Sequence, residues 1–218
     1  MELLHLIIDF VLHLDRHLVE LLVRFDVWIY AIVFLVIFAE TGFVVTPFLP
    51  GDSLLFALGA LAAVDTSGTL SAPLLTVLVC AAAILGNTVN YAIGKAIGRQ
   101  AFSGRYRFIK LDYLHQTERY FERHGALTIV LSRFAPIIRT FAPFVAGIGH
   151  MSYGKFQGYN VLGALLWVTL FTWTGYFFGN IPFIKDNFGL VTIAIIIVSM
   201  LPMVVMMVRA RSEAAAGR

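Results

Sequence analysis

Four charged residues interrupt two long apolar stretches of this chain: Glu40, Asp52, Arg133, Arg139. The two acids lie in the first stretch, residues 27–64, and the two arginines lie in the second, residues 126–150. Each charge at the centre of a bilayer costs about 2.5–3.5 kcal/mol on insertion scales. Ionisable groups at such positions are usually paired and functional. Their formal charges sum to zero, so we expect the acids to meet the arginines.

The arginines and the acids are suited to different chemistry. Arg133 and Arg139 stay protonated and present planar forks that match a phosphate group. Glu40 or Asp52 can alternate between a proton and an arginine, which is the behaviour needed in a proton-driven carrier. We therefore predict a phosphate-binding role for the arginines and a proton-coupling or ion-pair role for the acids. The alternative is two buried salt bridges with a purely structural role.

Proline and glycine break the helices that carry these charges. The predicted hairpin hinges are Pro47, Pro50, Gly51, Pro136, Pro143 and Gly147. Proline removes a backbone donor, and non-helical backbone at membrane depth must be covered by protein or line a watery cavity. We therefore predict two oppositely oriented re-entrant helical hairpins, residues 27–64 and 126–155. Polar and aromatic residues nearby either line a cavity between them or only join helices: Asn87, Asn90, Tyr91, Asn160, Trp167.

The composition places the rest of the chain in a membrane. Of 218 residues, 59% are hydrophobic and 13% are charged, whereas soluble domains carry about 25% charged residues. The net charge of +3 is too small to suggest a nucleic-acid partner. The single cysteine excludes an intramolecular disulfide. We expect an all-α membrane protein, residues 1–218 forming one membrane domain.

The remaining segments follow from apolar length and from the placement of basic residues. We predict transmembrane helices at residues 72–97, 157–180 and 188–208, because each offers about 20 apolar residues. Residues 1–26 form an amphipathic N-terminal helix. Lysine and arginine concentrate in residues 98–124 and at the C-terminal tail, 209–218, which predicts that both are cytoplasmic.

The two hairpins share hints of an inverted repeat. Each contains Pro-Phe-x-x-Gly, at Pro47 and at Pro143, and the helix after each ends in Gly-x-x-x-Gly. Two such units in opposite orientation are typical of transporters whose site lies where broken helices meet. The chain has no hydrolase, metalloprotease or nucleotide-binding motif, so we expect no enzyme, cofactor or metal.

The sequence resembles the DedA family of membrane proteins, within the wider SNARE-associated/VTT superfamily. The similarity covers nearly the whole chain and lies in residues 38–53 (FAETGFVVTPFLPGDS), 86–94 (GNTVNYAIG) and 132–147 (SRFAPIIRTFAPFVAG). It implies paired re-entrant hairpins, a multi-pass location in the bacterial inner membrane and a role as a lipid carrier, including recycling of undecaprenyl phosphate. Its required acids match Glu40 and Asp52, and its required arginines match Arg133 and Arg139.

Three functions are therefore considered. The first is a proton-linked flippase, driven by the proton motive force, for undecaprenyl phosphate or a related phospholipid. The second is a proton-coupled transporter of small ions or cationic compounds, and the third is a structural scaffold. The expected partners are membrane lipids (polyprenyl phosphate or phospholipid) and protons, and a homo-oligomer is compatible with the sequence.

Overall fold

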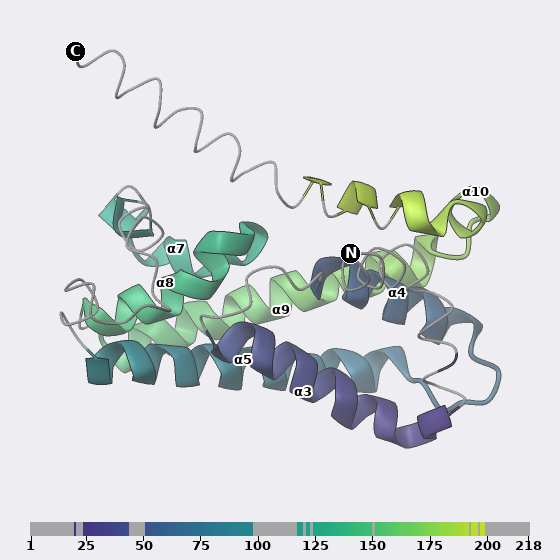
Figure 1. The fold of residues 1–218 in the computed structure, drawn as a ribbon, viewed down its shortest axis with the longest axis horizontal. Coiled ribbons are helices and arrows are strands. Elements are labelled where there is room, and N and C mark those ends of the chain that lie inside the picture. Colours follow the sequence, from purple (N-terminus) through teal and green to yellow (C-terminus); the bar gives the residue numbers. More distant parts are fainter. Residues whose placement is uncertain are drawn as a thin grey trace, which may run out of the picture.

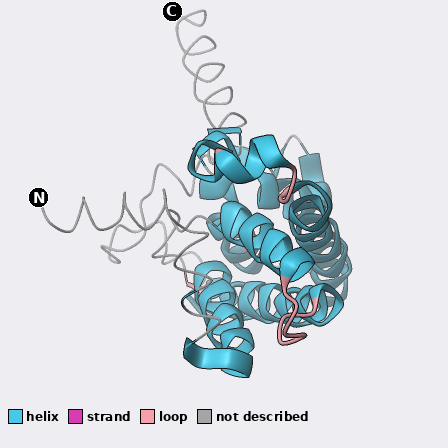
Figure 2. Cartoon of the chain, turned by 90° about the vertical axis from the view of Figure 1, so that its right-hand side faces the viewer, coloured by secondary structure: helices cyan, strands magenta, loops and turns pink. Residues whose placement is uncertain are grey.

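The computed structural model describes residues 20, 24–43, 51–97, 117–119, 121–122, 124–149, 151–191, 193–195 and 197–198 (Figure 1). Over these residues the chain is helical and contains no strand (Figure 2). The elements in order are η1 (Asp26–Trp28), α3 (Ile29–Gly42), α4 (Gly51–Val64), α5 (Ala72–Ile97), η3 (Gly125–Leu127), α7 (Thr128–Leu131), η4 (Ser132–Phe134), α8 (Pro136–Ile148), α9 (Tyr153–Phe178) and α10 (Pro182–Asp186). The predicted all-α class is confirmed for this part of the chain.

Helices α5 and α9 are long and apolar enough to cross a membrane. Each has 26 residues and so is about 39 Å long, against about 30 Å for the hydrocarbon core of a bilayer. The bounds of α5 are those predicted, and α9 covers most of the predicted helix 157–180. The third predicted span, 188–208, lies mostly outside the described residues, as do most of 1–26, most of 98–124 and all of 209–218.

One face of α9 is both apolar and exposed. Its exposed large side chains include Val161, Leu162, Leu165, Leu166 and Leu170. Steps of one, three and four residues place them on a single helix face. An exposed apolar stripe of this length is suited to contact with lipid.

Glycines allow α4 and α8 to dock closely on the two long helices. A Cβ added at Gly175 of α9 would lie 2.0 Å from the carbonyl oxygen of Phe56 in α4. A Cβ added at Gly94 of α5 would lie 2.1 Å from the carbonyl oxygen of Phe144 in α8. Helices α4 and α8 therefore dock in the same manner: α4 packs near the C-terminal end of α9, and α8 packs near the C-terminal end of α5 (Figure 1).

The break before α8 has a local cause. Ala135 is extended, with φ −131° and ψ 101°, because proline disfavours the helical region for the residue before it. Pro136 is then the first residue of α8, where its missing N–H has no helical partner to lose. The helical run therefore breaks immediately before Pro136, which was predicted as a hinge.

Two other predicted hinges are wrong, and two lie outside the described residues. Pro143 and Gly147 both lie inside α8, which continues to Ile148. Gly147 is a packing residue instead, because its backbone contacts that of Tyr91 in α5. Pro47 and Pro50 belong to a segment that the structure does not describe.

The two ends of the segment from η1 to α5 lie together. The Tyr30 hydroxyl donates to the carbonyl of Thr69 at 3.1 Å and accepts from the backbone N–H of Ser71 at 2.7 Å. The Thr69 hydroxyl donates to Asp26 at 3.0 Å. In the intervening turn, the hydroxyl of Ser67 holds the pKa of Asp65 below its usual value. The start of α3 and the loop after α4 are therefore fixed to each other.

We expect Gly175→Ala to loosen the docking of α4 on α9. Its methyl group would meet the backbone of Phe56, and overpacking of this kind costs about 1–3 kcal/mol. Thermal unfolding in detergent should show a lower midpoint. Gly158→Ala, in the same helix, is the control, since nothing lies within 4 Å of its added Cβ and alanine favours the helix by about 1 kcal/mol. Equal midpoints for the two variants would contradict the tight docking.

Candidate functional site

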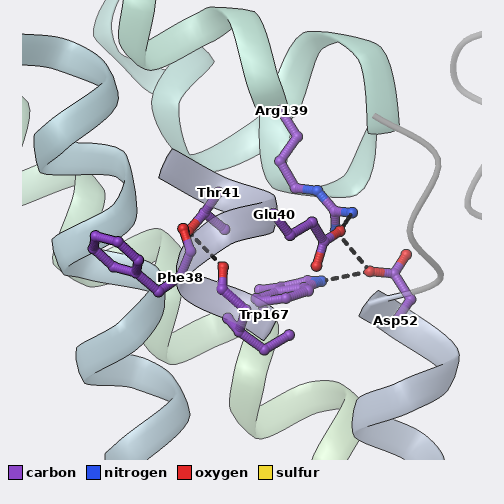
Figure 3. Close-up of polar contacts among 7 residues, drawn as sticks. Phe38, Glu40, Thr41, Asp52, Arg139 and Trp167 are labelled. Atoms are coloured by element: carbon purple, nitrogen blue, oxygen red, sulfur yellow. Dashed lines mark hydrogen bonds and ion pairs between the residues drawn. The ribbon is translucent and has the colours of Figure 1, made fainter. Parts of the chain in front are cut away.

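Three helix ends meet around one buried guanidinium (Figure 3). Arg139 lies in the first turn of α8, Glu40 in the last turn of α3 and Asp52 in the first turn of α4. The Arg139 Nη1 donates to Asp52 Oδ1 at 2.9 Å, and its Nη2 donates to Glu40 Oε1. All three residues are at most 6% exposed. The prediction that the acids meet the arginines is therefore correct for one arginine only, because both acids bind Arg139.

Helix dipoles make this cluster mutually dependent. Glu40 lies at the C-terminal end of α3 and Arg139 at the N-terminal start of α8, and each position is the unfavourable end for its charge. Asp52 occupies the favourable N-terminal turn of α4. Pairing across the three ends offsets the two unfavourable placements, so Arg139 and Glu40 stabilise each other.

Trp167 of α9 contacts both arginines and one acid. Its indole Nε1 donates to Asp52 Oδ1 at 2.8 Å. The guanidinium carbon of Arg139 lies 5.1 Å from the ring centroid and that of Arg133 lies 5.9 Å from it, both within the range of a cation–π interaction. Trp167 is fully buried. The predicted cavity-lining residue is thus the side chain that joins the two arginines.

Asn90 of α5 fixes the backbone next to the main ion pair. Its Nδ2 donates to the carbonyl of Thr41 at 3.2 Å and to that of Thr140 at 2.7 Å. Thr41 follows Glu40 in the chain, and Thr140 follows Arg139. One amide therefore holds both partners of the Glu40–Arg139 pair in register.

Two glycines leave room for the charged side chains. A Cβ added at Gly51 would lie 2.4 Å from Glu40 Oε2, and one at Gly163 would lie 3.1 Å from Arg133 Nε. Gly51 was predicted as a hinge, and it begins α4. Its close approach to the carboxylate is a further reason for glycine at this position.

Arg133, the middle residue of η4, is buried without a carboxylate partner among the described residues. Its Nη2 donates to Asn160 Oδ1 at 2.8 Å and to the carbonyls of Asn160 and Ala83 at 3.3 and 3.5 Å. Within the described part of the chain its Nε and Nη1 have no hydrogen-bond partner, and the residue is 1% exposed. A buried guanidinium with two unpaired nitrogens is a strong candidate to bind an anion.

The other predicted site residues divide into two groups. Asn87 donates from Nδ2 to Asn160 Oδ1 at 2.9 Å, which places both amides beside Arg133. Tyr91 instead serves a structural role. Its hydroxyl donates to the carbonyl of Met151, and its ring stacks on that of Phe156 with 4.4 Å between the ring centroids. Sequence reasoning missed the parts played by Thr41 and Thr140, although each directly follows a predicted charge.

Comparison with known proteins agrees with the predicted resemblance. Residues 49–177 match the VTT domain family. The chain is 54% identical to Protein DedA of Escherichia coli K12 over 216 residues, covering 99% of this chain and 98% of that one. It is 40% identical over 174 residues to an uncharacterized membrane protein of Mycobacterium tuberculosis H37Rv, covering 79% and 76% of the two chains.

A further relative indicates the location. Inner membrane protein YghB of Escherichia coli K12 is 35% identical over 180 residues, covering 82% of this chain and 78% of that one. Its name, together with α5 and α9, supports a place in the bacterial inner membrane. No solved structure matches this chain. A domain match over more than half the chain and a full-length relative at 54% identity show that this protein belongs to the DedA family of VTT-domain membrane proteins.

Proposed function

We propose that this protein carries a phosphate-bearing lipid, undecaprenyl phosphate or a related phospholipid, across the bacterial inner membrane. The observation that carries the proposal is Arg133, whose buried guanidinium has two nitrogens without a hydrogen-bond partner among the residues that the structure describes. A phosphate oxygen is the acceptor that best suits such donors. Family membership agrees with a membrane role, while the names of the relatives specify no substrate.

Charge balance supports a link to protons. Arg139, Glu40 and Asp52 together carry a formal charge of −1, which Arg133 balances across the buried site. An anionic head group would leave the site negative unless a proton entered with it, and uncompensated charge is costly in a dry interior. Glu40 Oε2 has no hydrogen-bond partner in the described ranges of the chain. A proton can bind there without displacing any bond, and a neutral Glu40 would hold Arg139 less strongly.

The docking pattern supports two inverted units, each with a re-entrant arm. Phe56-x-x-Gly59 of α4 and Phe144-x-x-Gly147 of α8 make equivalent backbone contacts with α9 and α5. An alignment of the two units on these Phe-x-x-Gly segments replaces the sequence-based alignment of Pro47 with Pro143. The contact between the start of α3 and the loop after α4 supports an arm that enters and leaves on one side. The arms would meet at Arg139, in the middle of the membrane.

The geometry is less favourable to the two alternatives. A carrier of cations would need a carboxylate that is not already in an ion pair, yet Glu40 and Asp52 both pair with Arg139. A scaffold would account for that ion cluster, which ties α3, α4 and α8 together. It would not account for Arg133, which is buried and has no carboxylate partner among the described residues, because such a charge destabilises a purely structural core.

We expect Arg133→Gln to abolish binding and translocation of a polyprenyl phosphate, and to lower the thermal stability of the protein less than Arg139→Gln does. The variant removes the proposed anion site but leaves both buried carboxylates bound to Arg139. Native mass spectrometry of purified protein with a polyprenyl phosphate, and transport in liposomes, measure the two activities. The corresponding polyprenol, which lacks the phosphate, is the control ligand. Unchanged transport by this variant would contradict the proposal.

Arg139→Gln should behave differently because it leaves two buried carboxylates without their partner. Breaking a buried ion pair on one side costs about 3–5 kcal/mol. Chemical or thermal unfolding in the same detergent should therefore rank Arg139→Gln well below Arg133→Gln. Equal stability of the two variants would mean that the acids are not held by Arg139 alone.

Glu40→Gln tests the link to protons. The amide mimics the protonated acid, so the variant should still bind the polyprenyl phosphate while its transport no longer responds to an imposed pH gradient. Liposomes with and without a gradient provide the measurement, and Glu20→Gln, in a residue outside the cluster, is the control. A response equal to that of the unmodified protein would place the proton elsewhere.

A further inference from the structure

A chain of polar side chains leads from Arg133 to the surface between α5 and α9. Arg133 donates to Asn160 Oδ1 at 2.8 Å, and Asn160 Nδ2 donates to Gln157 Oε1 at 2.9 Å. Gln157 Nε2 then donates to the hydroxyls of Thr88 at 2.7 Å and Tyr153 at 2.8 Å. We call Asn160, Gln157, Thr88 and Tyr153 the polar track. It is continuous in hydrogen bonds from the buried cation to Tyr153, the first residue of α9.

Exposure rises steadily along the polar track. Asn160 is fully buried, Gln157 and Thr88 are half-buried, and Tyr153 is 53% exposed. From Tyr153 to Asn160 the helix rises about 10 Å, roughly a third of the hydrocarbon thickness. Polar side chains at this depth are costly in lipid unless they serve binding or transport. The hydrogen bonds among these side chains use only part of their donors and acceptors, so a polar head group can exchange with them.

Apolar side chains flank the polar track on the lipid side. Leu85, one turn from Thr88 on α5, is 50% exposed, and Val161, one turn from Gln157 on α9, is 38% exposed. A lipid could therefore place its head group on the track while its chain stays in the hydrocarbon.

The opposite half of α9 offers no comparable route. Beyond Trp167 the helix packs on α4 through backbone contacts: a Cβ at Gly59 would lie 1.9 Å from the carbonyl oxygen of Thr172. The matching contact of Gly175 with Phe56 is just as tight. The described packing therefore closes this half to any side chain or head group.

We infer that the polar track is the route by which an anionic lipid head group reaches Arg133 from the membrane side where α5 ends and α9 begins. That side is the predicted cytoplasmic one, because the basic segment 98–124 follows α5. The inference rests on the proposed function for its ligand. The solvent access of the track is a property of the fold alone, so it can be tested separately.

The test is cysteine labelling in inside-out vesicles. Cys80 is the chain's single cysteine and is buried, so Cys80→Ala gives a background without thiols. Thr88→Cys and Gln157→Cys place one thiol on the track from either helix. Leu162→Cys, 47% exposed on the lipid face, and the buried Thr172→Cys are controls in α9. The probe is a membrane-impermeant, anionic methanethiosulfonate, and labelling in denaturant normalises the amount of protein.

We expect both track thiols to react roughly tenfold or more faster than either control, because reaction needs a hydrated thiolate. A polyprenyl phosphate should slow this reaction and the matching polyprenol should not. Track thiols that react no faster than the Leu162 control would overturn the inference, whatever the lipid does. Fast labelling that the phosphate lipid does not slow would instead support a hydrated route and contradict the proposed ligand.

Discussion

The buried guanidinium of Arg139 is the constraint on which this structure depends. A charge in a dry interior must be matched by opposite charge held at hydrogen-bonding distance, and here the match comes from two different helices. Glu40 and Asp52 reach it only if α3 ends and α4 begins at the same place beside the first turn of α8. The ion cluster therefore defines where α3 ends and where α4 and α8 begin, and the other contacts preserve that meeting point.

The long helices α5 and α9 hold the ends of α3, α4 and α8 in place through different side chains. Trp167 of α9 donates to Asp52 and lies against both guanidinium groups, while Asn90 of α5 holds the carbonyls beside Glu40 and Arg139. Glycine-mediated docking of α4 and α8 sets the helices at backbone distance. One consequence is a difference between the two arginines. Both acids pair with Arg139, so Arg133 is available to bind another anion.

Much of this could be predicted from the sequence, and the remainder depends on three-dimensional pairing. Charge is so scarce in the apolar stretches that Glu40, Asp52, Arg133 and Arg139 stand out, and the bounds of α5 follow from its uncharged length. Which acid binds which arginine depends on where the helices begin and end in space. The spacing of these residues along the sequence does not contain that information. Pro143 was misjudged because the helix tolerates it when α5 packs alongside. The polar track had a visible signal, since Tyr153, Gln157 and Asn160 recur at helical spacing in an apolar helix.

The most direct test is a structure of the protein in a lipid nanodisc with a polyprenyl phosphate bound. We predict a phosphate oxygen about 3 Å from Nε or Nη1 of Arg133, the two nitrogens for which no described residue is a hydrogen-bond partner. A phosphate bound away from Arg133, with Nε and Nη1 still unpaired, would contradict the assignment of Arg133 as the anion site.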